Sequence, residues 1–333
     1  MTDKFEKFFT STLNEILEEH ISTLTNQEEI DNFYKKYEEA DFSDLYDTMI
    51  NNVSDQMVEH SKSIMHENSL FFRSEEAEIL ARINRKWSNA FVASETMYMM
   101  VFEAVENYSV FVKEMDEVER EENLQTFTAL KYIHGRGLQQ FLEIITLMKN
   151  GFADAAYARW RSLYELNIVA SFISKYGEKV AESYISSRNS EDRYEWARAC
   201  GEFNSKKKYI RFDDIKNKAD FPSNLWRHQY QLANEVTHPS SQGTFNRLGT
   251  MPSEEIISVG RTDFGLTTPG EHSAITLAQL TGTFLTVYPS GDALLAASMI
   301  NKWVDVVREA YFKTHDYIFP EEPKLWCEGE NIS

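Results

Sequence analysis

The stretch from Thr126 to Lys175 most strongly constrains how this chain folds. Two long helical patterns flank Lys149-Asn150-Gly151, which predicts two helices folded back on each other. The first pattern places seven residues on one face at three- and four-residue spacing: Phe127, Leu130, His134, Leu138, Phe141, Ile145 and Met148. The second carries no charge between Glu165 and Lys175, and we expect it to be a central, largely buried helix.

The charges that do occur on the second helix mark a candidate site. At 100° per residue, Arg161 and Glu165 fall on one stripe with small side chains, so the two charges lie one turn apart in a groove. A buried ion pair is costly unless it is well partnered, and such pairs are over-represented at functional sites. The pair is equally compatible with a structural role in the bundle. His134, the one polar position on the apolar face of the first helix, is either a core histidine or a binding residue.

Composition restricts the class of protein. Glycine (13) and proline (7) are scarce in 333 residues, while helix-forming residues are plentiful, which is typical of an all-α protein. The longest apolar runs fall well short of the roughly 20 residues that span a membrane. The start, MTDKFEKFF, lacks the pattern of a secretory signal, so we expect a cytoplasmic protein. Only Cys200 and Cys327 occur, and no Cys/His cluster accompanies them, so no disulfide scaffold or structural metal site is predicted.

Charge is distributed unevenly along the chain. The formal net charge is -19, which on its own argues against nucleic acid as a partner. Residues 1–123 hold 28 acidic and 11 basic side chains, a net of -17, whereas residues 131–261 hold 19 basic and 15 acidic, a net of +4. The candidate site therefore lies in the basic part of the chain. We expect the acidic region to cover a protein partner or the rest of its own chain.

The order of the patterns predicts three parts. Residues 1–120 form an acidic helical region with one long connecting helix that starts at Ser74, and the polar stretch 116–123 marks its end. Residues 121–318 form a helical bundle, and residues 319–333 form an extended tail. The other predicted helices are 3–24, 26–39, 43–65, 178–203, 223–239, 274–286 and 290–315, with a long loop at 239–273.

Two further features follow the hairpin in the sequence. Four cations occur in one short stretch beside Tyr209 and Phe212: Lys206, Lys207, Lys208 and Arg211. Such a stretch suits a phosphate backbone, although a triple lysine is also typical of a solvated turn. His238 stands before Pro239, which ends its helix, and helix carbonyls at that position raise the pKa of an imidazole. His238 is either a functional group or a helix cap packed under the loop.

Two segments in this order, ARWRSLYELNIVASFI and LANEVTHPSSQG, carry a family resemblance. The chain resembles an uncharacterised bacterial family whose members share an Arg-x3-Glu helix and a later helix ending in Val-x-His. That family is distantly similar to the HEPN helical domains, bundles of four to five helices that often serve as RNA-cutting toxins and anti-phage effectors. The resemblance covers roughly residues 125–315. The resemblance implies a HEPN-like bundle that forms a homodimer.

The HEPN ribonuclease motif is Arg, a polar residue, three further residues and His. In ANEVTH, Asn234 and His238 occupy the polar and histidine positions, whereas Ala233 occupies the arginine position. The nearest arginines are Arg227, nearly two turns earlier, and Arg161 on the other helix. The resemblance therefore implies a site in which an arginine from elsewhere replaces the missing one.

In such a site the chemistry is metal-independent. His238 acts as general acid or base, while Arg161 steadies the charge that develops on the phosphate. Asn234 orients the imidazole or binds the phosphate, and Glu165 holds Arg161. No metal and no cofactor is expected.

Two functions remain open. The first is an RNA-directed ribonuclease in bacterial stress or phage defence, favoured by the asymmetric charge and by Asn234 and His238. The second is a non-catalytic helical module that binds a protein partner or a nucleotide in the Arg161/Glu165 groove, favoured by Ala233. The sequence contains no GxGxxG, GxxxxGK[ST], GxSxG or HExxH motif, which leaves nucleotide-binding folds and metalloproteases without support.

Overall fold

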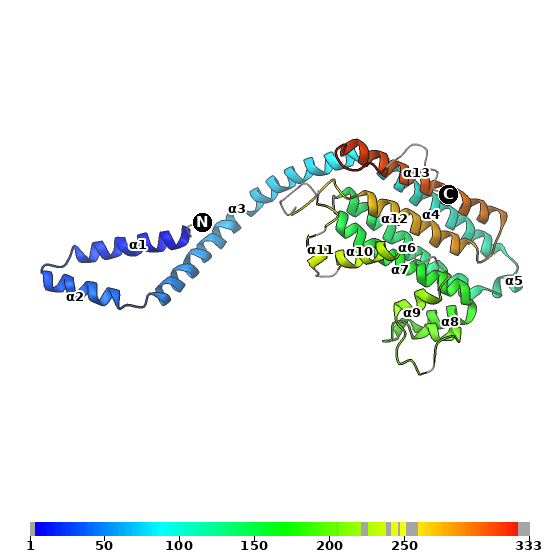
Figure 1. Cartoon of the computed structure of the whole chain (residues 1–333), viewed down its shortest axis with the longest axis horizontal. Coiled ribbons are helices and arrows are strands. Elements are labelled where there is room, and N and C mark those ends of the chain that lie inside the picture. The colour runs from blue at the N-terminus through cyan, green and yellow to red at the C-terminus, as the bar shows by residue number, and fades with distance from the viewer. Residues whose placement is uncertain are drawn as a thin grey trace. The chain divides into compact units, whose positions relative to one another are not determined.

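The computed structural model describes residues 4–204, 206–220, 226–237, 241–245, 247–250 and 259–325. Within these ranges every element is a helix, which confirms the all-α class (Figure 1). The chain divides into two compact units, Met1–Glu76 and Ala77–Ser333. No helix of the described part has the length and apolar character needed to cross a membrane.

The first unit contains α1 (Lys4–Ile21), α2 (Gln27–Glu38) and most of α3 (Ser43–Lys86). The Asn26 side chain accepts a hydrogen bond from the Glu29 N–H and so caps α2. Phe5 and Phe9 of α1 contact Tyr46 of α3, with ring centroids 5.4 and 4.8 Å apart. Among residues 4–76 whose side chains are described, none is buried. The unit therefore has aromatic contacts without a closed core.

A break at Trp87 replaces the long connecting helix expected from Ser74. Helix α3 runs through Ser74 and ends at Lys86, and α4 (Ser88–Glu114) follows after one residue. The Trp87 side chain is fully buried, and its Nε1–H donates to the Asp263 carbonyl at 2.9 Å. The helix starts before Ser74 because a serine followed by carboxylates also fits inside a helix. It breaks where the indole enters the core of the second unit.

Helix α4 belongs to the second unit, although residues 77–120 were expected in the N-terminal region. It packs against three helices of the bundle: α6 (Leu124–Lys149), α12 (Thr267–Leu285) and α13 (Gly291–Ile318). The stretch expected as a polar connector holds only the short helix α5 (Glu117–Glu121). The boundary between the two units thus lies between residues 76 and 77, within α3.

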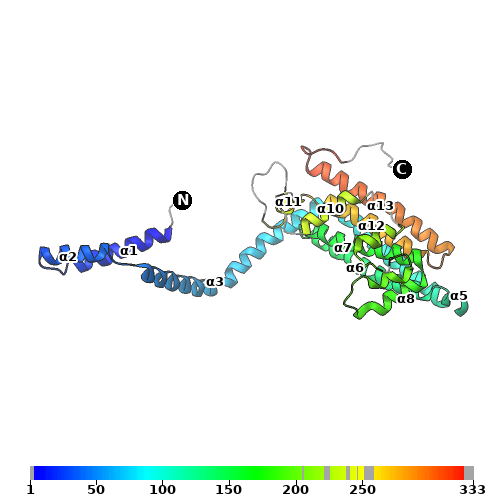
Figure 2. The same ribbon diagram turned by 60° about the horizontal axis from the view of Figure 1, so that its bottom comes forward.

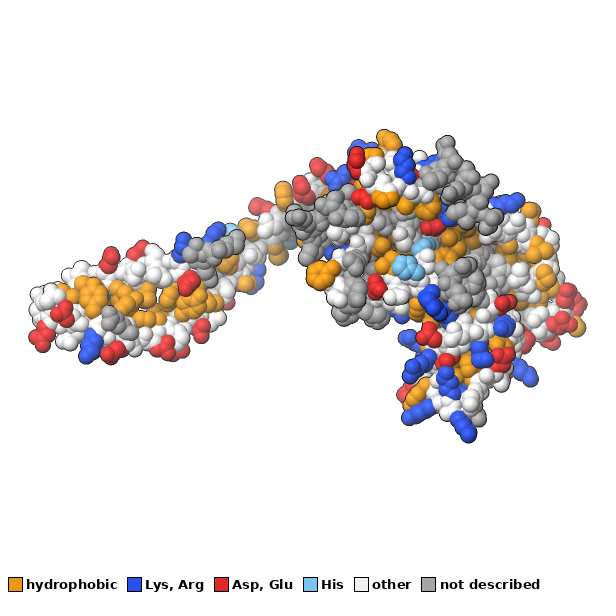
Figure 3. Space-filling model, viewed as in Figure 1, with side chains coloured by type: hydrophobic (Ala, Val, Ile, Leu, Met, Phe, Trp, Pro, Cys, Tyr) orange, Lys and Arg blue, Asp and Glu red, His pale blue; other side chains and the backbone are white. Residues whose placement is uncertain are grey.

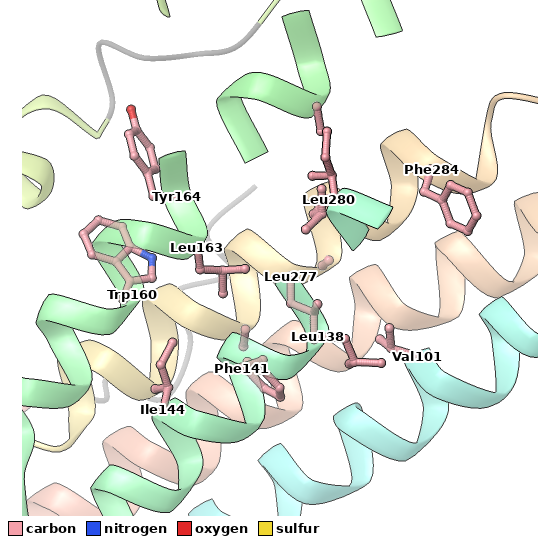
Figure 4. Packing of buried hydrophobic residues seen from close by; sticks show 14 of the residues in the cluster. Val101, Leu138, Phe141, Ile144, Trp160, Leu163, Tyr164, Leu277, Leu280 and Phe284 are labelled. Atoms are coloured by element: carbon pink, nitrogen blue, oxygen red, sulfur yellow. The ribbon is translucent and has the colours of Figure 1, made fainter. Parts of the chain in front are cut away.

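The predicted hairpin is present as α6 and α7 (Ala153–Tyr176). Gly151 makes the turn with a φ of 75°, where a side chain would also collide with Thr262. All seven residues of the predicted apolar face of α6 are buried, as are most of the residues of α7. Figure 4 shows Phe141 of α6 and Leu163 of α7 pointing into this core with Leu277 and Leu280 of α12. The predicted central role of α7 is confirmed.

Helix α12 lies between the hairpin and α13, in contact with α4, α6, α7 and α13 (Figure 2). It begins at Thr267, inside the loop expected at 239–273, because Pro269 is tolerated in a first helical turn. Gly270 leaves no room for a side chain, since the Tyr311 ring of α13 packs directly against it. This close approach fixes α12 against α13.

The segment directly after the hairpin differs from the prediction. The helix expected at 178–203 ends early, as α8 (Glu178–Ser186), and two 3-10 turns follow: η1 (Ser187–Asn189) and η2 (Glu195–Cys200). Serine and asparagine side chains compete for backbone hydrogen bonds, which explains the early end. Three helices complete the unit: α9 (Phe212–Lys218), α10 (Arg227–Thr237) and α11 (Ser241–Phe245). Helices α9 and α10 pack on α7 and so bring their side chains to its outer face.

Candidate functional site

The ion pair predicted on α7 is present and well partnered. Arg161 Nη2 lies 3.0 Å from Glu165 Oε1, and both side chains are about a quarter exposed. The Tyr230 hydroxyl of α10 donates to the same carboxylate oxygen at 2.8 Å. The Arg161 guanidinium carbon lies 5.5 Å from the centroid of the Tyr230 ring. Arg161 is therefore held in place by a carboxylate and an aromatic ring from two helices.

A groove of about 550 Å³ opens beside this pair, and we call it the Arg161 groove. Its walls come from α7, α9 and α10. The described residues that line it are Arg161, Arg211, Phe212, Asp213, Lys216, Arg227, Tyr230, Gln231 and Asn234. Four of these are cationic and one is acidic, which gives the lining a net charge of +3. The groove therefore favours an anion.

The cations of the groove are largely uncompensated. Within the described ranges, no carboxylate lies within ion-pair distance of the side chains of Arg211, Lys216 or Arg227. Lys216 Nζ instead lies 5.1 Å from the centroid of the Tyr230 ring. Figure 3 shows Lys and Arg side chains gathered over the part of the unit that holds α8 and α9. The positive charge is a local feature of an otherwise acidic chain.

Two polar atoms at the groove lack a partner. Arg161 Nε and Asn234 Oδ1 are both buried, and neither has a hydrogen-bond partner among the described residues. Buried polar groups are almost always satisfied, so such atoms need an explanation. Rotation of the Asn234 amide places its Nδ2–H groups at the same point. Both residues line the groove, so these unpartnered atoms lie in its wall.

Four predicted residues thus come together. Arg161, Arg211, Arg227 and Asn234 line one groove, and Glu165 supports it by holding Arg161. The packing of α10 on the outer face of α7 unites them, because it places Arg227 and Asn234 opposite Arg161. His238, the expected acid or base, lies outside the described residues.

The triple lysine does not line the groove. Lys207 forms an ion pair with Asp214, and Lys208 Nζ lies 5.1 Å from the centroid of its neighbour's ring, Tyr209. Lys206 is exposed. These three side chains belong to the loop before α9, whereas Arg211, directly before α9, reaches the groove.

His134 lies in the core, away from the Arg161 groove. Its Nε2 lies 2.9 Å from Thr281 Oγ1 of α12, and its ring stacks on Phe284 with centroids 5.3 Å apart. The side chain is 1% exposed, and burial lowers the pKa of His134 to about 4. Of the two alternatives stated for His134, a core histidine or a binding residue, its position fits the core histidine.

Sequence reasoning missed four residues of the groove: Asp213, Lys216, Tyr230 and Gln231. Arg227, Tyr230 and Asn234 recur at i, i+3 and i+7, so the polar face of α10 was visible in the sequence. Lys216 gave no comparable indication, because its distance from Arg161 depends on how α9 packs on α7. The groove offers cations and an amide, which suit an anion better than a metal ion. No group of three or more His, Cys, Asp or Glu side chains suited to a metal ion occurs in the described segments.

Residues 127–218 match a family described as Family of unknown function (DUF5677). The match supports the resemblance to an uncharacterised family over the hairpin and the segments through α9. It includes the parts of the Arg161 groove that come from α7 and α9, while α10 lies beyond it. No curated protein and no solved structure matches the chain.

Proposed function

We propose that the Arg161 groove binds the phosphate groups of RNA. The observation that carries this proposal is the meeting of four cations from three elements in one hollow, three of them without an ion pair among the described residues. Cations that neutralise phosphates supply most of the sequence-independent affinity of nucleic-acid-binding proteins. Arg161 adds a directional donor, because Glu165 holds its guanidinium in place and Tyr230 donates to the same carboxylate oxygen. RNA is preferred over a simple anion because the rings of Phe212 and Tyr230 line the same groove.

The proposal is tested by fluorescence anisotropy with a labelled single-stranded RNA at several salt concentrations. Arg227→Ala and Lys216→Ala each remove one cation without removing a hydrogen bond or ion pair seen in the described structure. We expect each to weaken binding at low salt and to reduce the slope of log K against log salt by about 1. Lys302→Ala is the matched control, because Lys302 is exposed on α13 and does not line the groove. Binding by both groove variants that equals that of the wild type would rule the proposal out.

A metal-independent, HEPN-like ribonuclease acting in bacterial stress or phage defence is the second candidate. The observation that favours it is that Arg161 and Asn234 share one groove, as the motif resemblance requires. In this candidate His238 supplies the acid or base and Arg161 stabilises the phosphate. Purified wild type should then cut RNA in the presence of EDTA, and His238→Ala should bind the same RNA without cutting it. If the wild type binds RNA without cutting it, the ribonuclease is ruled out and the non-catalytic binding module remains.

The resemblance also implies a homodimer, and the acidic N-terminal region remains a proposed surface for a protein partner or regulator. Sedimentation at several concentrations tests the first of these. A chain that sediments as a monomer throughout the micromolar range would contradict a stable homodimer without affecting RNA binding in the groove.

A further inference from the structure

A second hollow of about 580 Å³ lies between α6, α8 and the turns η1 and η2. We call it the Trp196 hollow. Three aromatic residues line it, Tyr132 from α6, Tyr184 from α8 and Trp196 from η2, together with Arg188 and Arg193. No family motif or sequence pattern pointed to this place.

The aromatic residues form a floor and a rim. Trp196 is buried, and its ring meets that of Tyr184 edge to face, with centroids 5.0 Å apart at 84°. The Trp196 Nε1–H donates to the Arg193 carbonyl, which fixes the floor. Tyr132 is 76% exposed at the rim, where its ring contributes little to the core. Aromatic faces in this arrangement suit a flat, apolar ring system, because bases stack on them regardless of sequence.

The charge of the hollow suits an anion. Of the described residues that line it, none is acidic and two are arginines. Neither Arg188 nor Arg193 has an ion-pair partner in the described part of the chain. Two such arginines are unexpected on a chain with a net charge of -19, because a surface arginine there finds a carboxylate easily. A ligand with a flat ring and a negative charge satisfies both the rings and the arginines.

Tyr194 connects this hollow to the Arg161 groove. It follows Arg193 in the chain, and its ring lies 6.3 Å from that of Phe212, which lines the groove. The Arg193 guanidinium carbon lies 5.9 Å from the centroid of the Tyr194 ring. The charges of Glu165 and Arg161 both act on the Tyr194 hydroxyl, whose pKa is raised mainly by burial. The two hollows are therefore neighbours on one surface, separated by the Tyr194 side chain.

We propose that the Trp196 hollow holds a nucleobase of the RNA whose phosphates bind in the Arg161 groove. The base stacks on Tyr132 over the floor made by Trp196 and Tyr184. Arg188 and Arg193 bind the phosphate that links this nucleotide to those in the Arg161 groove. This inference rests on the proposed function, and it narrows the ligand to single-stranded RNA with an accessible base.

The test compares two fluorescent probes, a single-stranded RNA of about ten nucleotides and an abasic strand with the same number of phosphates. Tyr132→Ala should weaken binding of the RNA by about tenfold and leave binding of the abasic strand unchanged. Tyr132→Phe keeps the ring and should restore RNA binding. Tyr317→Ala is the control for the loss of an exposed tyrosine, because Tyr317 is 87% exposed on α13.

The outcomes separate the two proposals. If Arg227→Ala weakens both probes and Tyr132→Ala weakens neither, the base-binding hollow is ruled out and the phosphate groove stands. Equal weakening of both probes by Tyr132→Ala would also overturn the hollow, since the ring would then act on the phosphate site. If the wild type binds neither probe, both proposals fail.

Discussion

Two buried histidines show how residue-level chemistry depends on tertiary packing. His134 is paired with Thr281, and His272 lies with its Nδ1 3.1 Å from the Tyr157 hydroxyl. Burial lowers the pKa of His134 to about 4, and burial together with the charge of Arg308 lowers that of His272 to about 3. Both side chains are therefore neutral at pH 7, and neither is suited to donate a proton in catalysis near that pH.

These two histidines make the protein sensitive to acid. The pKa of each is lower in the folded chain than its ordinary value of 6.5, so the unfolded chain binds protons that the folded chain does not. The stability that each neutral histidine contributes is present above its unfolded pKa of 6.5 and is lost as the pH falls towards its folded pKa, about 4 for His134 and about 3 for His272. At pH 5 each histidine should have cost about 2 kcal/mol of unfolding free energy.

Urea unfolding of wild type and His134→Asn at pH 7.5 and pH 5 measures this effect. The variant should be less stable at pH 7.5, because it loses core packing, but its stability should fall less on acidification. A pH dependence that is the same in both proteins would show that His134 does not titrate in this way.

At the residue scale, the sequence predicted side-chain contacts within one helix but not contacts between helices. The Arg161/Glu165 pair follows from i,i+4 spacing on α7 and is present at 3.0 Å. The contribution of Tyr230 to that pair joins residues 65 positions apart, so only the packing of α10 on α7 places it. His134 was ambiguous for the same reason, because Thr281 lies 147 positions away.

At the scale of elements, helix α6 begins with a cap supplied by another helix. Asn123 makes no side-chain cap, and instead the Glu178 carboxylate accepts the backbone N–H groups of Gln125 and Thr126 at 3.0 and 2.8 Å. Glu178 is the first residue of α8. A carboxylate at a helix N-terminus satisfies free N–H groups and interacts favourably with the helix dipole. The start of the hairpin is thereby tied to the segment that follows it.

We expect Glu178→Ala to destabilise the protein by about 1–2 kcal/mol, because two N–H groups of α6 lose their acceptor. Thermal unfolding of the variant checks this. Glu182→Ala is the matched control in the same helix, because Glu182 is exposed and, among the described residues, Glu178 rather than Glu182 accepts the N–H groups of α6. If both variants melt at the same temperature, the carboxylate does not stabilise α6.

Periodicity predicted some elements better than others. The hairpin was found because α6 repeats its apolar face along its whole length and α7 carries no charge between Glu165 and Lys175. The end of α3 could not be predicted, since it depends on where Trp87 enters the core and bonds to Asp263. The early end of α8 had a local cause, the serines and asparagine of residues 186–190, and was visible in the sequence.

On the scale of the whole molecule, the two units differ in how much they bury. The second unit encloses a continuous core that includes Trp87, Phe141, Trp160 and Tyr311. The first unit has no buried side chain among those described, and Leu70, Phe71 and Phe72 are each about two thirds exposed. Hydrophobic burial supplies most of the free energy of folding, so the first unit is the less stable of the two.

Limited digestion with trypsin should therefore remove the first unit before it cuts the second. We expect a persistent fragment that starts near Ser74, after the exposed Arg73, and retains the C-terminal bundle. Mass spectrometry of the fragments identifies its ends. Early cuts within α6 or α7 would contradict the difference in stability.

The placement of Trp226 gives the molecule a built-in optical probe. Trp226 directly precedes Arg227 of the Arg161 groove, and its ring lies 5.9 Å from that of Trp160 and 6.5 Å from that of Tyr164. It is 9% exposed, so its emission depends on the groove wall rather than on bulk water. We expect an anion bound in the groove to change the electric field at this indole, because Arg227 is the next residue in the chain. Occupancy of the groove should then change the intrinsic fluorescence, and this change can be measured without any added label.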